Sequence, residues 1–227
     1  MGCNDSRRAV LTEEDQIQLA EHRLVPQAIS PSLVSSILNK YSKNHIITDS
    51  QLVRIVSILG KAGPPAATKQ TYFGNSYFHA EPTGFDKGRV GVLFLLLSQG
   101  SAEEKTREVA VMWGMEEFTP ADVEKLVRCI VSISVIYCPL LVNSTSLAMR
   151  TYVAALHSCA DTVVRSLTAA ITEQEALLSI DQLVLKLANS RLGSIWTPTG
   201  TRSLIIKSTH SDNSQKWLIF LHKVNYT

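Results

Sequence analysis

The chain has 227 residues, a formal net charge of +2, and 45% hydrophobic and 19% charged residues. This length fits one medium domain or two small ones and can bury a sizeable core. The composition excludes a largely disordered chain, and the balanced charge gives no global basic field for nucleic acid.

The first six residues carry a lipidation pattern. They read MGCNDS and match M-G-x-x-x-[ST], the pattern for N-myristoylation of Gly2 once the initiator methionine is removed. Because one myristoyl chain holds a protein only marginally on a bilayer, Cys3 is a candidate for a second, reversible acyl chain. Arg7 and Arg8 add a small basic contribution. The sequence therefore predicts a lipidated segment over residues 1–11.

Residues 12–191 predict a helical domain, because apolar residues recur at helical spacing and cap residues precede them. A region rich in glycine and proline interrupts the helices and predicts a long loop over 61–88. The longest apolar run, 129–142, contains a proline and is too short to span a membrane. The predicted helices start at Thr12, Ser30, Thr48 or Asp49, Val90, Ser101, Thr119, Asn143 or Ser144, and at a capping box Thr172–Glu175.

The tail over 192–227 has a different character. Two short β-rich apolar runs, Leu204–Ile206 and Trp217–Leu221, flank a polar stretch. They are compatible with a hairpin, although an isolated hairpin is marginal in water. The tail fits either the start of a further domain or a sequence peculiar to this chain.

Catalytic and metal-binding motifs are absent from the sequence. There is no nucleophile elbow, P-loop, dinucleotide fingerprint or zinc signature, and the four cysteines have neither C-x-x-C spacing nor a nearby histidine at the spacing of metal ligands. We therefore expect no enzyme, no cofactor and no metal. The alternative is an enzyme with an unrecognised site in the glycine-rich loop, around Tyr72, Tyr77, His79 and Asp86.

One segment resembles EF-hand proteins of the calcium-sensor and calcineurin-B type. Leu93–Lys105 reads LFLLLSQGSAEEK, a hydrophobic helix end, a linker and the opening of a next helix, and Phe118–Leu126 continues the similarity. The connection Trp113–Phe118 lacks the twelve-residue loop and the acidic ligands that calcium needs. The resemblance implies an all-α, degenerate EF-hand-like helical bundle without its metal.

Together with Gly2, this region resembles the N-terminal part of TLDc (TBC/LysM-associated) proteins that are myristoylated and linked to lysosomes and mTOR signalling. Over residues 1–190 the likeness lies in the order of the segments, and only over 93–135 does it lie in the amino acids themselves. It does not include the TLDc domain. It implies a place at the cytoplasmic face of lysosomal or plasma membranes. Only Gly2 carries over as a functional residue.

These observations lead to one main functional hypothesis, a non-catalytic adaptor anchored to a membrane by its lipid. An EF-hand pair without metal can still bind a partner helix. The candidate partner-binding residues are Met112, Trp113, Met115 and Phe118, for which ordinary core packing is the other role. A calcium sensor with a non-standard loop remains an alternative from another class.

Overall fold

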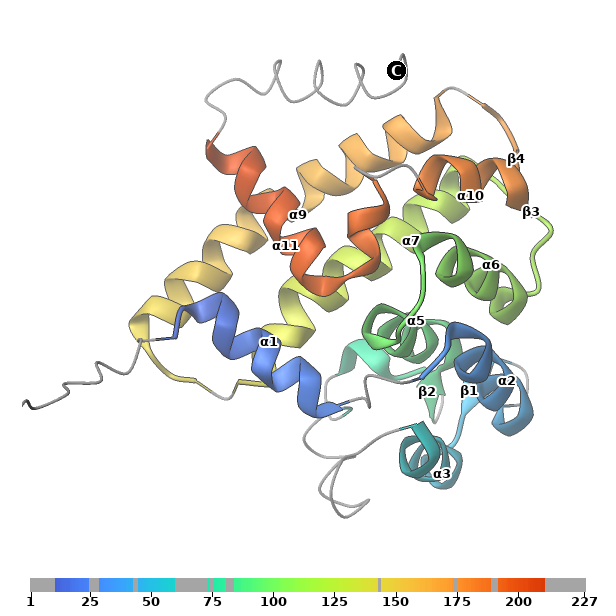
Figure 1. Ribbon diagram of the computed structural model, residues 1–227, viewed down its shortest axis with the longest axis horizontal. Helices are drawn as coiled ribbons and strands as arrows, with labels where there is room; N and C mark the ends of the chain where they lie inside the picture. Colours follow the sequence, from blue (N-terminus) through green and yellow to red (C-terminus); the bar gives the residue numbers. More distant parts are fainter. Residues whose placement is uncertain are drawn as a thin grey trace, which may run out of the picture.

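Helices dominate the protein, which confirms the all-α prediction. The computed structural model describes residues 11–24, 29–42, 45–59, 73, 76–80, 84–142, 144–173, 175–188 and 192–210 (Figure 1). The α-helices are α1 (Glu13–Leu24), α2 (Pro31–Tyr41), α3 (Asp49–Leu59), α5 (Lys87–Leu97), α6 (Ala102–Trp113), α7 (Pro120–Ser132), α8 (Cys138–Leu140), α9 (Leu147–Thr172), α10 (Ile180–Ala188) and α11 (Pro198–His210). The other elements are the strands β1 (Ile46–Ile47), β2 (Phe85–Asp86), β3 (Glu117–Phe118) and β4 (Leu178–Ser179), the 3-10 turns η1 (Ser76–Phe78) and η3 (Gly193–Trp196), and the π-helical η2 (Ile133–Tyr137).

Four helices begin directly behind a two-residue strand. β1 pairs antiparallel with β2, and β3 pairs antiparallel with β4. In every strand one apolar side chain is fully buried, and the next residue caps the following helix. These apolar residues are Ile47, Phe85, Phe118 and Leu178. α2 and α3, α6 and α7, and α9 and α10 each flank one of these strands.

Helix starts follow the caps that the sequence predicts at Ser30, Ser101 and Thr119. At α6, the Glu104 amide donates to the Ser101 hydroxyl at 3.1 Å, and the Ser101 amide donates to the Glu104 carboxylate at 2.8 Å. This reciprocal box satisfies two backbone donors that the helix itself cannot satisfy.

The capping box predicted at Thr172–Glu175 is wrong. Thr172 is the last residue of α9, and its hydroxyl donates to a carbonyl of the preceding turn. The box belongs to Ser179 and Gln182, whose side chains accept from each other's amides at 3.2 and 2.8 Å. The two boxes have equal spacing in the sequence, and β4 pairing with β3 places the helix start at the later one.

Two further boundaries differ from the sequence prediction. The loop expected over 61–88 ends earlier, because Asp86 accepts from the Arg89 amide at 2.9 Å and caps α5. Of that loop the described residues include the turn η1, while Tyr72 lies outside them. The next helix after α8 begins at Leu147 behind the cap Ser146, not at Asn143 or Ser144.

The start of the tail is helical, not a strand. Leu204–Ile206 lies inside α11, and Ile205 is fully buried in the common core. The β preference of isoleucine is weak beside the burial of a whole helix face. Residues 192–210 therefore form part of the helical domain, whereas Trp217–Leu221 lies outside the described residues.

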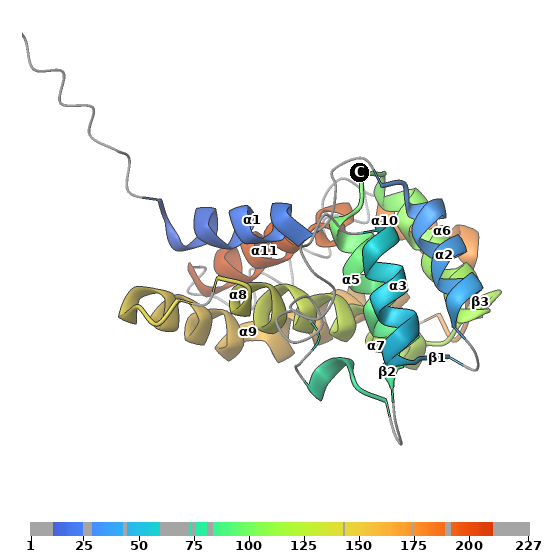
Figure 2. The same cartoon turned by 90° about the horizontal axis from the view of Figure 1, so that it is seen from below.

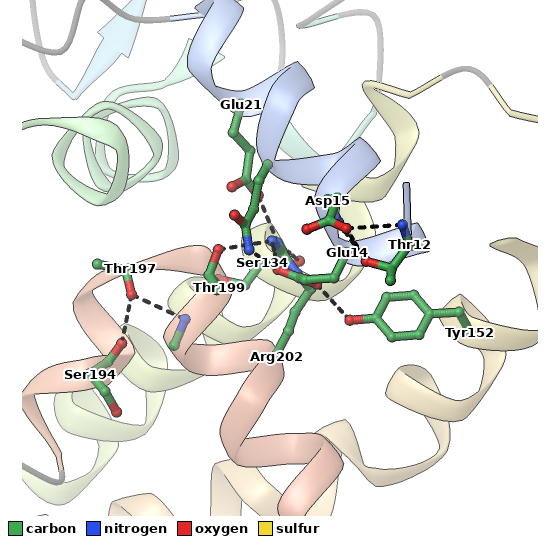
Figure 3. A network of polar contacts seen from close by, with 12 residues as sticks. Thr12, Glu14, Asp15, Glu21, Ser134, Tyr152, Ser194, Thr197, Thr199 and Arg202 are labelled. Carbon is green, nitrogen blue, oxygen red and sulfur yellow. Dashed lines mark hydrogen bonds and ion pairs between the residues drawn. The ribbon is translucent and has the colours of Figure 1, made fainter. Parts of the chain in front are cut away.

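Arg202 of α11 joins the last described helix to the first (Figure 3). Its Nε and Nη2 donate to the two carboxylate oxygens of Glu14 at 2.8 and 2.7 Å, and Nη1 donates to Glu21 at 2.7 Å. Tyr152 of α9 donates to the same Glu14 carboxylate at 2.6 Å. Because the Arg202 side chain is 0% exposed, this cluster holds α1 beside α11, as both views show (Figures 1 and 2).

The π-helical η2 supplies one more acceptor to Arg202. Within η2, the Cys138 amide donates to the Ile133 carbonyl, five residues back. Pro139 has no N–H to offer to the next carbonyl, that of Ser134. The Arg202 Nη1 donates to this carbonyl at 3.0 Å and fills the gap.

A buried lysine ties the start of the tail to the rest of the domain. Lys105 of α6 is 2% exposed, and its ammonium donates to the Leu96 carbonyl at 3.2 Å and the Trp196 carbonyl at 3.0 Å. These carbonyls close α5 and η3, where helix ends lack intrahelical donors. Burial lowers the pKa of Lys105 to about 8, and no carboxylate pairs with it among the described residues.

Candidate functional site

A cleft of about 390 Å³ opens beside the start of α5. One wall is the β2–α5 junction, another is the end of α6, and α7 forms the third. The lining residues are His45, Tyr77, Asp86, Gly88, Arg89, Trp113, Met115, Lys125, Arg128, Cys129 and Ser132. The cleft therefore combines aromatic and apolar surface with several cations.

Trp113 reaches the cleft because α6 ends there. The next residue, Gly114, has a φ of 66°, a left-handed conformation that suits glycine and stops the helix. The indole lies over Gly88, where an added Cβ would stand 2.9 Å from its Nε1. That buried Nε1–H has no hydrogen-bond partner among the described residues. An unsatisfied buried donor is costly.

Lys125 stands beside this donor. Its ammonium lies 5.3 Å from the centre of the Trp113 ring, within the range of a cation–π contact. It forms no ion pair with any residue that the structure describes. Within the described part of the chain, no carboxylate therefore balances the charge of this cation.

The two arginines of the cleft are already engaged. Arg128 contacts Glu124 at 2.8 Å and Asp161 at 2.7 Å. Arg89 lies 3.9 Å from Asp86 and stacks its guanidinium 4.9 Å from the Tyr77 ring centre. Their charges are offset by these carboxylates, whereas Lys125 forms no ion pair with any described residue and stays available to a bound anion.

Two lining residues, Cys129 and Tyr77, carry groups that could lose a proton. Burial raises the pKa of the Cys129 thiol to about 12, and burial likewise raises the pKa of the Tyr77 phenol. Both groups are therefore protonated at neutral pH. A thiolate is the reactive form of cysteine, so burial leaves the Cys129 thiol unactivated.

The residues of the enzyme alternative do not converge on a reaction centre in the part of the chain that is described. A ring nitrogen of His79 lies 3.2 Å from the Phe73 carbonyl. Asp86 caps α5, as described above. Among the described members of this set, Tyr77 and Asp86 line the cleft and His79 does not.

Two of the four predicted partner-binding residues lie in the cleft. Trp113 and Met115 line it, whereas Met112 and Phe118 are buried in the core and offer no surface to a partner. The prediction of exposed contacts is therefore wrong for Met112 and Phe118. Phe118 is instead the buried residue of β3. Gly2 and Cys3 lie outside the described residues.

Sequence reasoning missed Lys125 and Gly88. Lys125 lies in a mixed charged stretch that looks like an ordinary solvated helix face, and its closeness to Trp113 depends on how α6 meets α7. Gly88 appears in the sequence only as the end of a glycine-rich loop. The sequence does contain a signal for the helix that carries Gly88. Phe85 is followed by the cap Asp86, and an apolar residue followed by a cap also precedes α3, α7 and α10.

Searches against protein-family models, curated proteins and solved structures find no match to this chain. Within the described ranges, no three His, Cys, Asp or Glu side chains gather closely enough to hold a metal ion. The α6–α7 connection spans residues 114–119, and Asp122 behind it accepts from the Thr119 amide and hydroxyl at 3.0 and 2.6 Å. Among the helices described, none is both long and apolar enough to cross a membrane.

Proposed function

We propose that this protein is a non-catalytic adaptor, anchored to the cytoplasmic face of a membrane by a myristoyl group on Gly2. The MGCNDS start supports the anchor, and Cys3 is the site of a second acyl chain. The resemblance to TLDc proteins favours lysosomal or plasma membranes and a role in mTOR-type signalling.

The cleft at Trp113 is the proposed partner site. The observation that carries this is the Lys125 ammonium, which forms no ion pair with any described residue and lies 5.3 Å from the centre of the Trp113 ring. A carboxylate of the partner pairs with the Lys125 ammonium, and an apolar side chain packs on Trp113 and Met115, which line the cleft. The partner is therefore a protein segment that offers an apolar side chain next to an acidic residue.

The anchor is tested by intact mass after co-expression with an N-myristoyltransferase and myristate. The expected product is the chain without its initiator methionine and with one added myristoyl group, and Gly2→Ala should remove the addition. An unmodified mass for the wild type contradicts the anchor.

The cleft is tested by photo-crosslinking from position 115 in membrane fractions, with the same crosslinker at position 185 as a control. We expect a discrete adduct from position 115 only. Lys125→Glu should abolish it, whereas Lys207→Glu, a charge reversal on the exposed side of α11, should leave it unchanged. An adduct that survives Lys125→Glu contradicts the assigned site.

A further inference from the structure

Another cleft, of about 430 Å³, lies between α1, the turn that joins α5 to α6, and the start of α11. This volume is within the range of small-molecule sites. Among the described residues, it has no lining residue in common with the cleft at Trp113. We call it the α11 cleft. The lining residues that bear on its polar chemistry are Glu21, Gln99, Lys105 and Thr199.

Lys105 brings a buried positive charge to the α11 cleft. The residue is 2% exposed. Of its three N–H donors, two donate to the carbonyls of Leu96 and Trp196, at 3.2 and 3.0 Å. In the described part of the chain, the third donor has no acceptor and no carboxylate forms an ion pair with the ammonium. Because buried charges in proteins are normally paired, an anion in the cleft would supply the missing counter-ion.

The first turn of α11 adds a second feature that favours an anion. Thr197, Pro198 and Thr199 line the cleft, and this turn contains no acidic residue to complement the positive end of the helix dipole. The Thr197 hydroxyl accepts from the Gly200 amide at 3.1 Å, whereas the Thr199 amide has no intrahelical acceptor. Free amides at a helix start bind anions. Lys105 and Thr199 therefore offer an anion a charge and a hydrogen bond.

Glu21 also lines the α11 cleft and limits the charge that a ligand can carry there. Its carboxylate bonds to Arg202 at 2.7 Å, but Arg202 also pairs with Glu14, so this group keeps one surplus negative charge (Figure 3). Glu21 forms no ion pair with Lys105, the pKa of which is lowered by burial. Repulsion from Glu21 increases with the charge of the ligand. A singly charged carboxylate therefore fits the cleft better than a phosphate dianion.

The remaining lining favours a ligand with a hydrocarbon part, because Leu96, Leu97 and Pro198 line the same cleft and burial of apolar surface is favourable. We propose that the α11 cleft binds a small aliphatic monocarboxylate. Its carboxylate contacts the Lys105 ammonium and the Thr199 amide, and its hydrocarbon part packs on Leu97 and Pro198. The site is separate from the proposed partner cleft and does not depend on the lipid anchor.

The test titrates the full, isotope-labelled chain with hexanoate and follows the backbone amides of Thr199 and Gln99 by NMR. The Gly88 amide, in the other cleft, reports separately on binding beside Trp113. Hexanamide has the same hydrocarbon part without the charge, and inorganic phosphate has more charge without the hydrocarbon part. We expect saturable shifts of Thr199 and Gln99 with hexanoate, and at least tenfold weaker binding of hexanamide and of phosphate.

Three variants each lower the net charge by one and differ in where they do so. Lys105→Met removes the buried ammonium, Gln99→Glu adds a carboxylate at an exposed lining position, and Lys207→Met removes an exposed charge of α11. We expect hexanoate binding to weaken at least tenfold in Lys105→Met and at least threefold in Gln99→Glu, with a change below twofold in Lys207→Met. Because Gln99 is exposed, Gln99→Glu still decides the test if Lys105→Met does not fold.

The proposal is overturned if hexanoate shifts neither Thr199 nor Gln99, or if hexanamide binds as tightly as hexanoate. It is also overturned if Lys105→Met and Gln99→Glu bind hexanoate as the wild type does. Tighter binding of phosphate than of hexanoate would refute the monocarboxylate as the ligand. Shifts confined to Gly88 would place the anion in the cleft at Trp113 and refute the α11 cleft.

Discussion

Removal of Arg202 should destabilise the fold strongly. Its guanidinium is 0% exposed and bonds to Glu14 and Glu21 at 2.7 to 2.8 Å. Arg202→Met keeps much of the side-chain volume but leaves two carboxylates without their cation. Breaking a buried ion cluster from one side costs about 3–5 kcal/mol, because the remaining charge stays buried and uncompensated.

Arg128 offers a matched control. It also contacts two carboxylates, at 2.7 and 2.8 Å, but its side chain is 47% exposed. Water and salt screen such a pair, so Arg128→Met should cost less than about 1 kcal/mol. The two substitutions remove the same group from similar partners, and burial is the main difference between them.

Urea unfolding followed by circular dichroism measures both effects. With a slope of about 2 kcal/mol per molar urea, Arg202→Met should lower the midpoint by about 1.5–2.5 M and Arg128→Met by less than about 0.5 M. Arg202→Lys keeps the charge without the forked geometry and should fall between Arg202→Met and the wild type. Equal midpoint shifts for Arg202→Met and Arg128→Met would refute the assigned role of the buried cluster.

The same cluster makes a prediction about pH. Burial alone would raise the pKa of Glu14, but the hydrogen bond and charge of Arg202 outweigh it and lower that pKa below its ordinary value of 4.5. A carboxyl with a lowered pKa contributes stability above its ordinary pKa and loses it as the pH falls through the lowered value. The stability difference between wild type and Arg202→Met should therefore shrink as the pH falls from 6 to 3, and a constant difference would contradict the assignment.

Three other predictions concern single residues. Burial lowers the pKa of Lys105 to about 8 from 10.5, so the folded state releases this proton at a lower pH than the unfolded chain does. The wild type should therefore gain stability relative to Lys105→Met between pH 8 and 10. A constant difference between their urea midpoints over that range would contradict this. Ser179→Ala should cost about 1 kcal/mol of stability in thermal melts because it removes a helix cap, and Thr172→Ala should cost less. A larger loss for Thr172→Ala than for Ser179→Ala would favour the capping box predicted at Thr172–Glu175. Gly200→Ala should cost about 1–3 kcal/mol, since its Cβ would lie 2.0 Å from a backbone carbonyl of η3, and an unchanged melting temperature would show that this contact relaxes freely.

The parts of the fold that the sequence predicts well depend on bonds between near neighbours. Ser101 and Thr119 cap their helices through residues three positions away, so their residue types and spacing are sufficient evidence. The same spacing at Thr172 misleads, because Ser179 carries an equivalent box and only the pairing of β4 with β3 selects between them.

The candidate site could be predicted only in part. Trp113 and Met115 stand out in the sequence as large side chains near a helix end, and both line the cleft. Met112 and Phe118 look similar in sequence, yet they face the core. Lys125 becomes part of the site only because α7 brings it over the Trp113 ring.

The sequence by itself determined the helical class, most helix starts and the lipidation pattern at Gly2, because each depends on composition or on residues a few positions apart. Only the tertiary structure decided which helix faces are buried, that Leu204–Ile206 is helical, and that Arg202 meets Glu14 from 188 positions away. Local patterns leave such choices open. They are settled by which packing buries the most apolar surface while every buried charge finds a partner.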